Sequence, residues 1–145
     1  KGDIVFNNDL AIQEVNGEAE AYEVIEKELG IKPVKLWYMP QELIFDNLKI
    51  AKGCAILEFK YEEEILYVIY QSNGIETSIN HTSDAENQQK VNNKWLGKTI
   101  EMRREITEKG TIKYEARFIE QDTLYEVVGE LPEQEFVRIL EGLYY

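Results

Sequence analysis

The feature that most constrains this chain is the alternation of apolar and polar residues between Cys54 and Leu131, in short runs separated by turn-forming residues. Alternation with a period of two places every second side chain on the same face of a β-strand. A sheet built this way has one apolar face, which another layer must cover. Helical patterns precede and follow this region and can supply that layer. The sequence therefore predicts an α+β fold.

The helical patterns lie near the two ends of the chain. Residues 18–30 form an amphipathic helix with an acidic first turn, which Gly30 ends as a left-handed cap. Residues 132–143 form a second helix, and Pro132 suits its first position. We expect a single domain over 1–145, divided into a polar lead-in (1–17), the first helix (18–30), a sheet region (31–131) and the C-terminal helix (132–143).

Within the sheet region, turn signals separate the expected strands. Asn73-Gly74 is a strong hairpin signal, Glu62–Glu64 make a bend, and residues 81–93 are polar enough for a long surface loop with room for a short strand near Val91. Because short turns join consecutive strands, we predict a largely antiparallel meander sheet of about six to eight strands, with one face covered by the two helices. The expected strands are residues 43–50, 55–61, 65–70, 75–79, 99–107, 111–119 and 124–131.

Length and charge exclude several functions. A chain of 145 residues is long enough for one core. Its formal net charge of −12 repels phosphate backbones and anionic lipid, so we expect no nucleic-acid partner and no unassisted docking on a membrane. No apolar run approaches the roughly 20 residues that span a bilayer. Because the chain starts at Lys1 rather than methionine, we expect a fragment or processed form whose membrane anchor lies upstream.

No motif predicts a catalytic residue, a metal site or a cofactor. Cys54 and His81 are too few ligands for zinc, and the run Glu62–Glu64 lacks the spacing of a calcium loop. His81, Ser83 and Asp84 are adjacent, whereas the members of a catalytic triad converge from separate elements. We interpret Cys54 as a small buried residue rather than a reactive thiol. With 28 acidic residues, some pair of carboxylates will be at the spacing of a glycosidase by chance, and no pair stands out.

The candidate binding residues are aromatic. Trp37, Tyr38 and Trp95 have the large amphipathic rings that suit a groove holding a peptide or a lipid-like ligand. The competing interpretation, which a domain of this size favours, is that both tryptophans pack in the core.

Two segments resemble a known family. Residues 34–38 followed by Pro40-Gln41-Glu42-Leu43 resemble the opening of the domain of unknown function DUF4367 from Firmicutes, and residues 123–136 resemble its ending. The likeness covers about Ile31 to Leu143. It implies a domain that follows a transmembrane helix in anchored proteins, some of them sensory or similar to anti-sigma factors, and that faces outside the cytoplasm. The family has no established catalytic residues to carry over.

Three functions follow from these observations. The first is a non-enzymatic extracytoplasmic domain of a membrane-anchored bacterial protein, sensory, regulatory or protein-binding, whose partner is an unknown protein or small ligand. The second is a carrier-like module that holds a lipid-like or peptide ligand in a groove of the sheet. The third is a carboxylate-pair hydrolase acting on cell-wall glycan.

Overall fold

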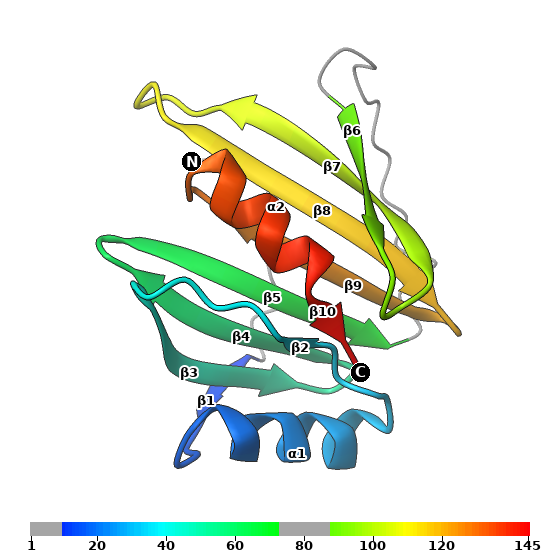
Figure 1. The fold of residues 1–145 in the computed structure, drawn as a ribbon. Helices are drawn as coiled ribbons and strands as arrows, with labels where there is room; N and C mark the ends of the chain where they lie inside the picture. The colour runs from blue at the N-terminus through cyan, green and yellow to red at the C-terminus, as the bar shows by residue number, and fades with distance from the viewer. Residues whose placement is uncertain (1–9, 73–87) are drawn as a thin grey trace.

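The computed structural model describes residues 10–72 and 88–145. Ten strands and two helices follow one another in these residues (Figure 1). In chain order they are β1 (Ala11–Gln13), α1 (Glu18–Leu29), β2 (Lys35–Leu36), β3 (Leu43–Ala51), β4 (Cys54–Tyr61), β5 (Glu64–Ser72), β6 (Gln88–Asn93), β7 (Lys98–Ile106), β8 (Ile112–Glu120), β9 (Thr123–Gly129), α2 (Glu133–Glu141) and β10 (Leu143–Tyr144).

Eight of the strands form one antiparallel sheet in the order β1-β3-β4-β5-β9-β8-β7-β6. The α+β fold with a largely antiparallel sheet is thus confirmed. The sheet consists of two meanders, β3-β4-β5 and β6-β7-β8-β9, which join where β5 pairs antiparallel with β9. The last long strand of the chain therefore lies at the centre of the sheet rather than at its edge.

Hydrophobicity explains why β9 is central and β6 is at an edge. Every residue of β9 except Glu126 is buried, so both faces of this strand need cover. In β6, only Val91 and Asn93 are buried, and its polar side chains suit an edge strand that must not pair with other chains. The short β1 occupies the opposite edge.

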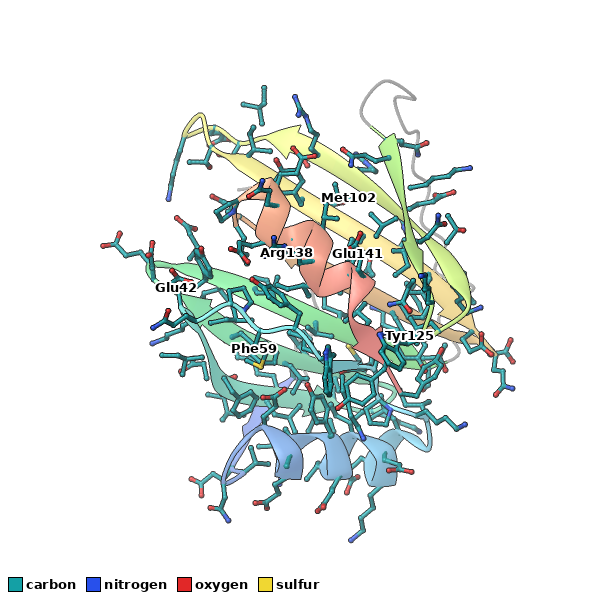
Figure 2. All side chains as sticks on the ribbon, in the orientation of Figure 1. Glu42, Phe59, Met102, Tyr125, Arg138 and Glu141 are labelled. Atoms are coloured by element: carbon teal, nitrogen blue, oxygen red, sulfur yellow. The ribbon has the colours of Figure 1, made fainter. Side chains whose placement is uncertain are left out.

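Both helices pack on one face of the sheet and contribute to a single hydrophobic core (Figures 1 and 2). Helix α1 lies along β3 and β4, and it ends at Gly30, whose φ of 69° is left-handed as expected from the sequence. Helix α2 lies against β6 and β8. Between the helices runs the two-stranded ladder of β2 and β10. The buried helical residues are Ala21, Tyr22, Ile25, Phe136, Ile139 and Leu140.

The other face of the sheet is not uniformly polar. Ile56, Ile69 and Val128 are buried there in a small second cluster on the three central strands, and Cys54 packs against it. Burial raises the pKa of the Cys54 thiol to about 11, which keeps it protonated at neutral pH. Cys54 is thus half-buried rather than fully buried as expected, and the expectation of a single apolar face is wrong at the centre of the sheet.

Three details differ from the sequence-based expectations. The lead-in contains β1, whose three residues pair with β3. The short strand expected near Val91 is β6, which extends from Gln88 to Asn93, and its polar side chains are those of an edge strand. Helix α2 ends at Glu141, and β10 follows it. The predicted hairpin at Asn73-Gly74 and the predicted strand 75–79 lie outside the described residues.

Two tyrosine hydroxyls hold the segment after α1 against the sheet. Tyr70 is fully buried, and its Oη donates a hydrogen bond of 2.6 Å to the carbonyl of Val34. The Oη of Tyr125 donates to the carbonyl of Lys32 at 2.9 Å. Burial raises the pKa of Tyr70 well above its ordinary value and that of Tyr125 to about 12. Both hydroxyls therefore remain donors at neutral pH.

We predict that Tyr70→Phe lowers the free energy of unfolding by about 1–3 kcal/mol, because it leaves the Val34 carbonyl without its donor in the core. Tyr125→Phe should cost less, about 0.5–1.5 kcal/mol, since its hydrogen bond is only partly buried. Urea unfolding monitored by circular dichroism measures both. Equal stability of Tyr70→Phe and the parent chain would contradict the role given to this hydroxyl.

Candidate functional site

Three aromatic side chains from separate segments meet on the surface. The ring centroids of Trp37 and Trp95 are 6.5 Å apart, and those of Trp37 and Tyr144 are 6.3 Å apart in an edge-to-face arrangement. Trp37 is 71% exposed and Trp95 is 67% exposed. We call Trp37, Trp95 and Tyr144 the aromatic patch. Tryptophan is highly buried on average, so two exposed indoles in contact are unusual.

The interpretation of both tryptophans as core residues is therefore wrong. Val34 and Leu36 are buried, and alternation along the extended segment directs Lys35 and Trp37 away from the core. Trp95 lies in the turn between β6 and β7, where no second layer covers it. The other strongly exposed large apolar residues in the described ranges are isoleucines: Ile12, Ile44, Ile106 and Ile119.

Tyr38 does not belong to the aromatic patch. Its Oη donates a 2.7 Å hydrogen bond to Oε1 of Glu135, and the guanidinium of Arg138 lies 5.7 Å from its ring centroid. Tyr38 therefore fastens the segment after β2 to helix α2. Of the three residues predicted to bind a ligand, the structure brings Trp37 and Trp95 together and gives Tyr38 these packing contacts. Tyr144 was not among the predicted residues.

The backbone of Trp37 is fixed at the end of α2. Its N–H donates to the carbonyl of Gly142 at 3.1 Å. A Cβ atom at Gly142 would lie 3.2 Å from the backbone nitrogen of Tyr38, closer than about nine in ten such contacts in proteins. Glycine at this position thus allows the segment that carries Trp37 to approach the helix.

The turn that carries Trp95 is fixed by a buried amide. Nδ2 of Asn93 donates to the carbonyls of Leu140 at 2.7 Å and Leu143 at 2.9 Å, and Oδ1 accepts from the N–H of Leu96 at 2.7 Å. Asn93 is 2% exposed. One side chain therefore joins the end of α2, the start of β10 and the β6–β7 turn.

A pocket of about 370 Å³ lies beside the aromatic patch, and we call it the α1 pocket. The Nζ of Lys35 lies 5.9 Å from the ring centroids of both Tyr22 and Tyr144, and the Oη of Tyr22 donates to Glu18 at 2.6 Å. Carboxylates and aromatic faces are the groups that stabilise an ammonium. The lining residues are Glu18, Ala19, Tyr22, Glu23, Glu26, Pro33, Lys35 and Tyr144.

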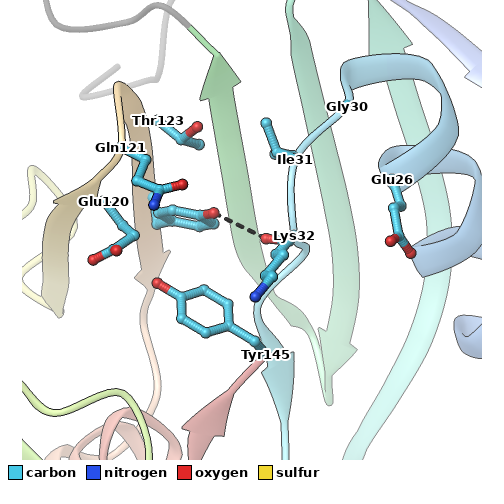
Figure 3. A pocket seen from close by; sticks show the side chains of 9 residues that line it. Glu26, Gly30, Ile31, Lys32, Glu120, Gln121, Thr123 and Tyr145 are labelled. Atoms are coloured by element: carbon cyan, nitrogen blue, oxygen red, sulfur yellow. Dashed lines mark hydrogen bonds between the residues drawn. The ribbon is translucent and has the colours of Figure 1, made fainter.

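A second pocket, of about 500 Å³, lies between the segment after α1 and the β8–β9 turn (Figure 3). In Figure 3, Glu120 and Gln121 lie across the pocket from Lys32, and Tyr145 lies below them. The Glu120 carboxylate is already paired with Lys98 at 2.6 Å. The Tyr145 hydroxyl is buried and makes no hydrogen bond within the described residues. The lining is Glu26, Gly30, Ile31, Lys32, Glu120, Gln121, Thr123, Tyr125 and Tyr145.

The half-buried carboxyl group of Glu126 merits comparison with a catalytic acid. Burial raises the pKa of Glu126, and the charge of its cross-strand neighbour Arg117 opposes that rise. Glu126 lies on β9 and lines neither pocket. Glu126 therefore resembles one member of a structural ion pair with Arg117 more than a general acid that faces a substrate.

Residues 10–72 and 88–145 contain no group of three metal-ligating side chains. Neither helix in these ranges is long and apolar enough to span a membrane. The adjacent His81, Ser83 and Asp84 lie outside the described residues.

Comparison with known proteins returned no matching family model, no matching curated protein and no matching solved structure. The likeness to DUF4367 therefore stays a prediction from the sequence.

We predict that Asn93→Asp lowers the free energy of unfolding by about 3–5 kcal/mol, because it places a buried charge against two carbonyl oxygens. The matched control is Asn92→Asp on the same strand. Asn92 is exposed and accepts a hydrogen bond from Thr99, which a carboxylate can still accept, so we expect a change within about 0.5 kcal/mol. Urea unfolding compares the variants, and equal losses would show that the Asn93 amide does not hold these elements together.

Proposed function

We propose that this chain is a non-enzymatic binding domain that recognises a partner protein through the aromatic patch. The observation that supports this proposal is the contact between Trp37 and Trp95, which come from separate segments and are both mainly exposed. Scattered apolar side chains are normal on a protein surface, whereas clustered ones mark interaction sites.

The residue types of the patch favour a protein partner. Tryptophan and tyrosine are enriched among the few interface residues that supply most of the binding energy. Each can bury a large area at a small cost in side-chain entropy. The backbone of Trp37 is bonded to Gly142, and that of Leu96, the residue after Trp95, is bonded to Asn93, so the segments that carry the patch are already positioned for binding.

The carrier-like alternative has less support. On the face of the sheet that carries the helices, apolar side chains of α1, α2, β2 and β10 fill the packed core, Leu36 and Leu143 among them. Trp37 and Trp95 are mainly exposed and line neither of the two pockets described above. For the hydrolase alternative, carboxylates do line both pockets, but Glu18 is hydrogen-bonded to Tyr22 and Glu120 is paired with Lys98. The other two, Glu23 and Glu26, are exposed on the surface of α1.

We also propose that the domain faces outside the cytoplasm, joined to the membrane by an anchor upstream of Lys1. This part of the proposal depends on the likeness of residues 34–43 and 123–136 to DUF4367. The acidic surface suits either side of the membrane, so the charge alone does not decide location.

We predict that Trp37→Ala with Trp95→Ala lowers capture of the partner from cells of the source organism by about tenfold or more, because it removes both indoles of the patch. Quantitative mass spectrometry of proteins cross-linked to the tagged chain provides the measurement. Stability should change by less than about 1.5 kcal/mol, since the lost ring contact is exposed.

Ile12→Ala with Ile106→Ala is the matched control, because these side chains are 63% and 71% exposed but lie on the edge strand β1 and on β7. It should capture the same partner as the parent chain. Equal capture by the parent chain and the double tryptophan variant would disprove binding through the patch.

Location has its own test. Cells are treated so that protease passes the layers outside the cytoplasmic membrane while that membrane stays intact. Added protease should then degrade this domain of the full-length protein and spare a cytoplasmic marker. Protection of the domain until the cytoplasmic membrane is lysed would overturn the proposed location and leave the binding proposal standing.

A further inference from the structure

We propose that the partner presents a basic segment, which places an apolar side chain on the aromatic patch and a lysine or arginine in the α1 pocket. This inference rests on the proposed function and specifies the chemistry of the partner. It commits to a cationic peptide rather than a glycan, a lipid or a second copy of the chain.

The first argument is continuity. Tyr144 belongs to the aromatic patch and also lines the α1 pocket. Lys35, which pairs with Tyr144 across the β2–β10 ladder, lines the same pocket. An extended peptide crossing the aromatic patch therefore meets the pocket within a few residues, since each residue spans about 3.3 Å.

The second argument is the charge of the α1 pocket. Glu18, Glu23 and Glu26 line it, and Lys35 is the single cation among its lining residues. The pocket therefore has an excess of negative charge next to an apolar surface. A ligand of matching chemistry carries positive charge beside an apolar group.

The third argument is the position of Lys35 itself. Its ammonium lies 5.9 Å from two ring centroids, those of Tyr22 and Tyr144. Cations at this distance from an aromatic face are attracted by the ring quadrupole. The pocket thus already accommodates one cation of this chain, and its remaining carboxylates can pair with another.

The charge of the whole chain disfavours the competing occupants, namely a second copy of the chain, a lipid and a glycan. A net charge of −12 attracts a basic partner and speeds its association, while it repels a second copy of the chain and anionic lipid. A neutral glycan can stack on indole rings, but it gains nothing from the three carboxylates. Charge complementarity therefore favours the basic segment.

The chain contains its own reporters for a test. Its two tryptophans are both in the aromatic patch, so intrinsic tryptophan emission reports on occupancy of the patch. The probes are short acetylated peptides in which phenylalanine alternates with lysine, with glutamine in place of lysine, or with glutamate in place of lysine. A chitin oligosaccharide is the uncharged glycan probe.

We expect the lysine peptide to change the emission saturably and to bind about tenfold more tightly than the glutamine peptide, with the glutamate peptide weaker still. Raising the ionic strength from about 0.01 M to about 0.15 M should weaken binding of the lysine peptide and leave binding of the glutamine peptide almost unchanged.

Glu23→Gln with Glu26→Gln tests the pocket directly. This variant should lower the affinity for the lysine peptide by about threefold to tenfold and leave the affinity for the glutamine peptide unchanged. The control is Glu14→Gln with Glu28→Gln, which changes the net charge equally at exposed residues that do not line the pocket. The control should bind the lysine peptide about as tightly as the parent chain does.

Equal binding of the lysine and glutamine peptides, or equal weakening by both double variants, would overturn the basic-segment proposal. So would a response to the oligosaccharide alone, or no response to any probe. The proposed function is judged separately, by whether the double tryptophan variant loses its captured partner.

Discussion

The surface that we propose as functional depends on the side-chain amide of Asn93. A helix leaves its last carbonyl groups without partners inside the helix, and here one amide satisfies Leu140 near the end of α2 and Leu143 in β10. Its oxygen accepts the N–H of Leu96 in the turn that carries Trp95. Since Trp37 is bonded to Gly142 in the same region, the relative position of the two indoles follows from where α2 ends.

Local patterns in the sequence were sufficient for both helices and for the long strands β3, β4, β5, β7, β8 and β9, but not for the short strands or for the order of strands in the sheet. The apolar stripes of the two helices, the left-handed cap of α1 at Gly30 and the turn at Glu62 depend on neighbours in sequence, so they are predictable. The central position of β9 depends on how residues distant in sequence share the core. A run buried on both faces was the available signal, because almost every residue from Thr123 to Gly129 is apolar or small. The polar β6 offered no such signal.

The same distinction applies to the binding surface. Residue type identified Trp37 and Trp95 as candidates, but whether each is buried depends on the direction in which its side chain points. For Trp37, the signal was alternation along the strand: Val34 and Leu36 point into the core, so Trp37 points outward. Tyr144 joins them only because β10 turns back to pair with β2, a contact between residues more than a hundred positions apart. Asn93 lies within the segment expected to be a loop, and nothing in its local sequence distinguishes it from the exposed Asn92.

The support of the aromatic patch and its exposure have separate energetic consequences. The buried groups Asn93 and Gly142 contribute to folding, whereas the exposed indoles keep most of their apolar area in water. That area becomes available as binding energy when a partner covers it, at about 25 cal/mol per Å² before the costs of association. Because the backbone beneath the indoles is already fixed by hydrogen bonds, little further ordering is required on binding. A substitution in the supporting residues should therefore affect both stability and binding, whereas a substitution in the indoles should affect binding much more than stability.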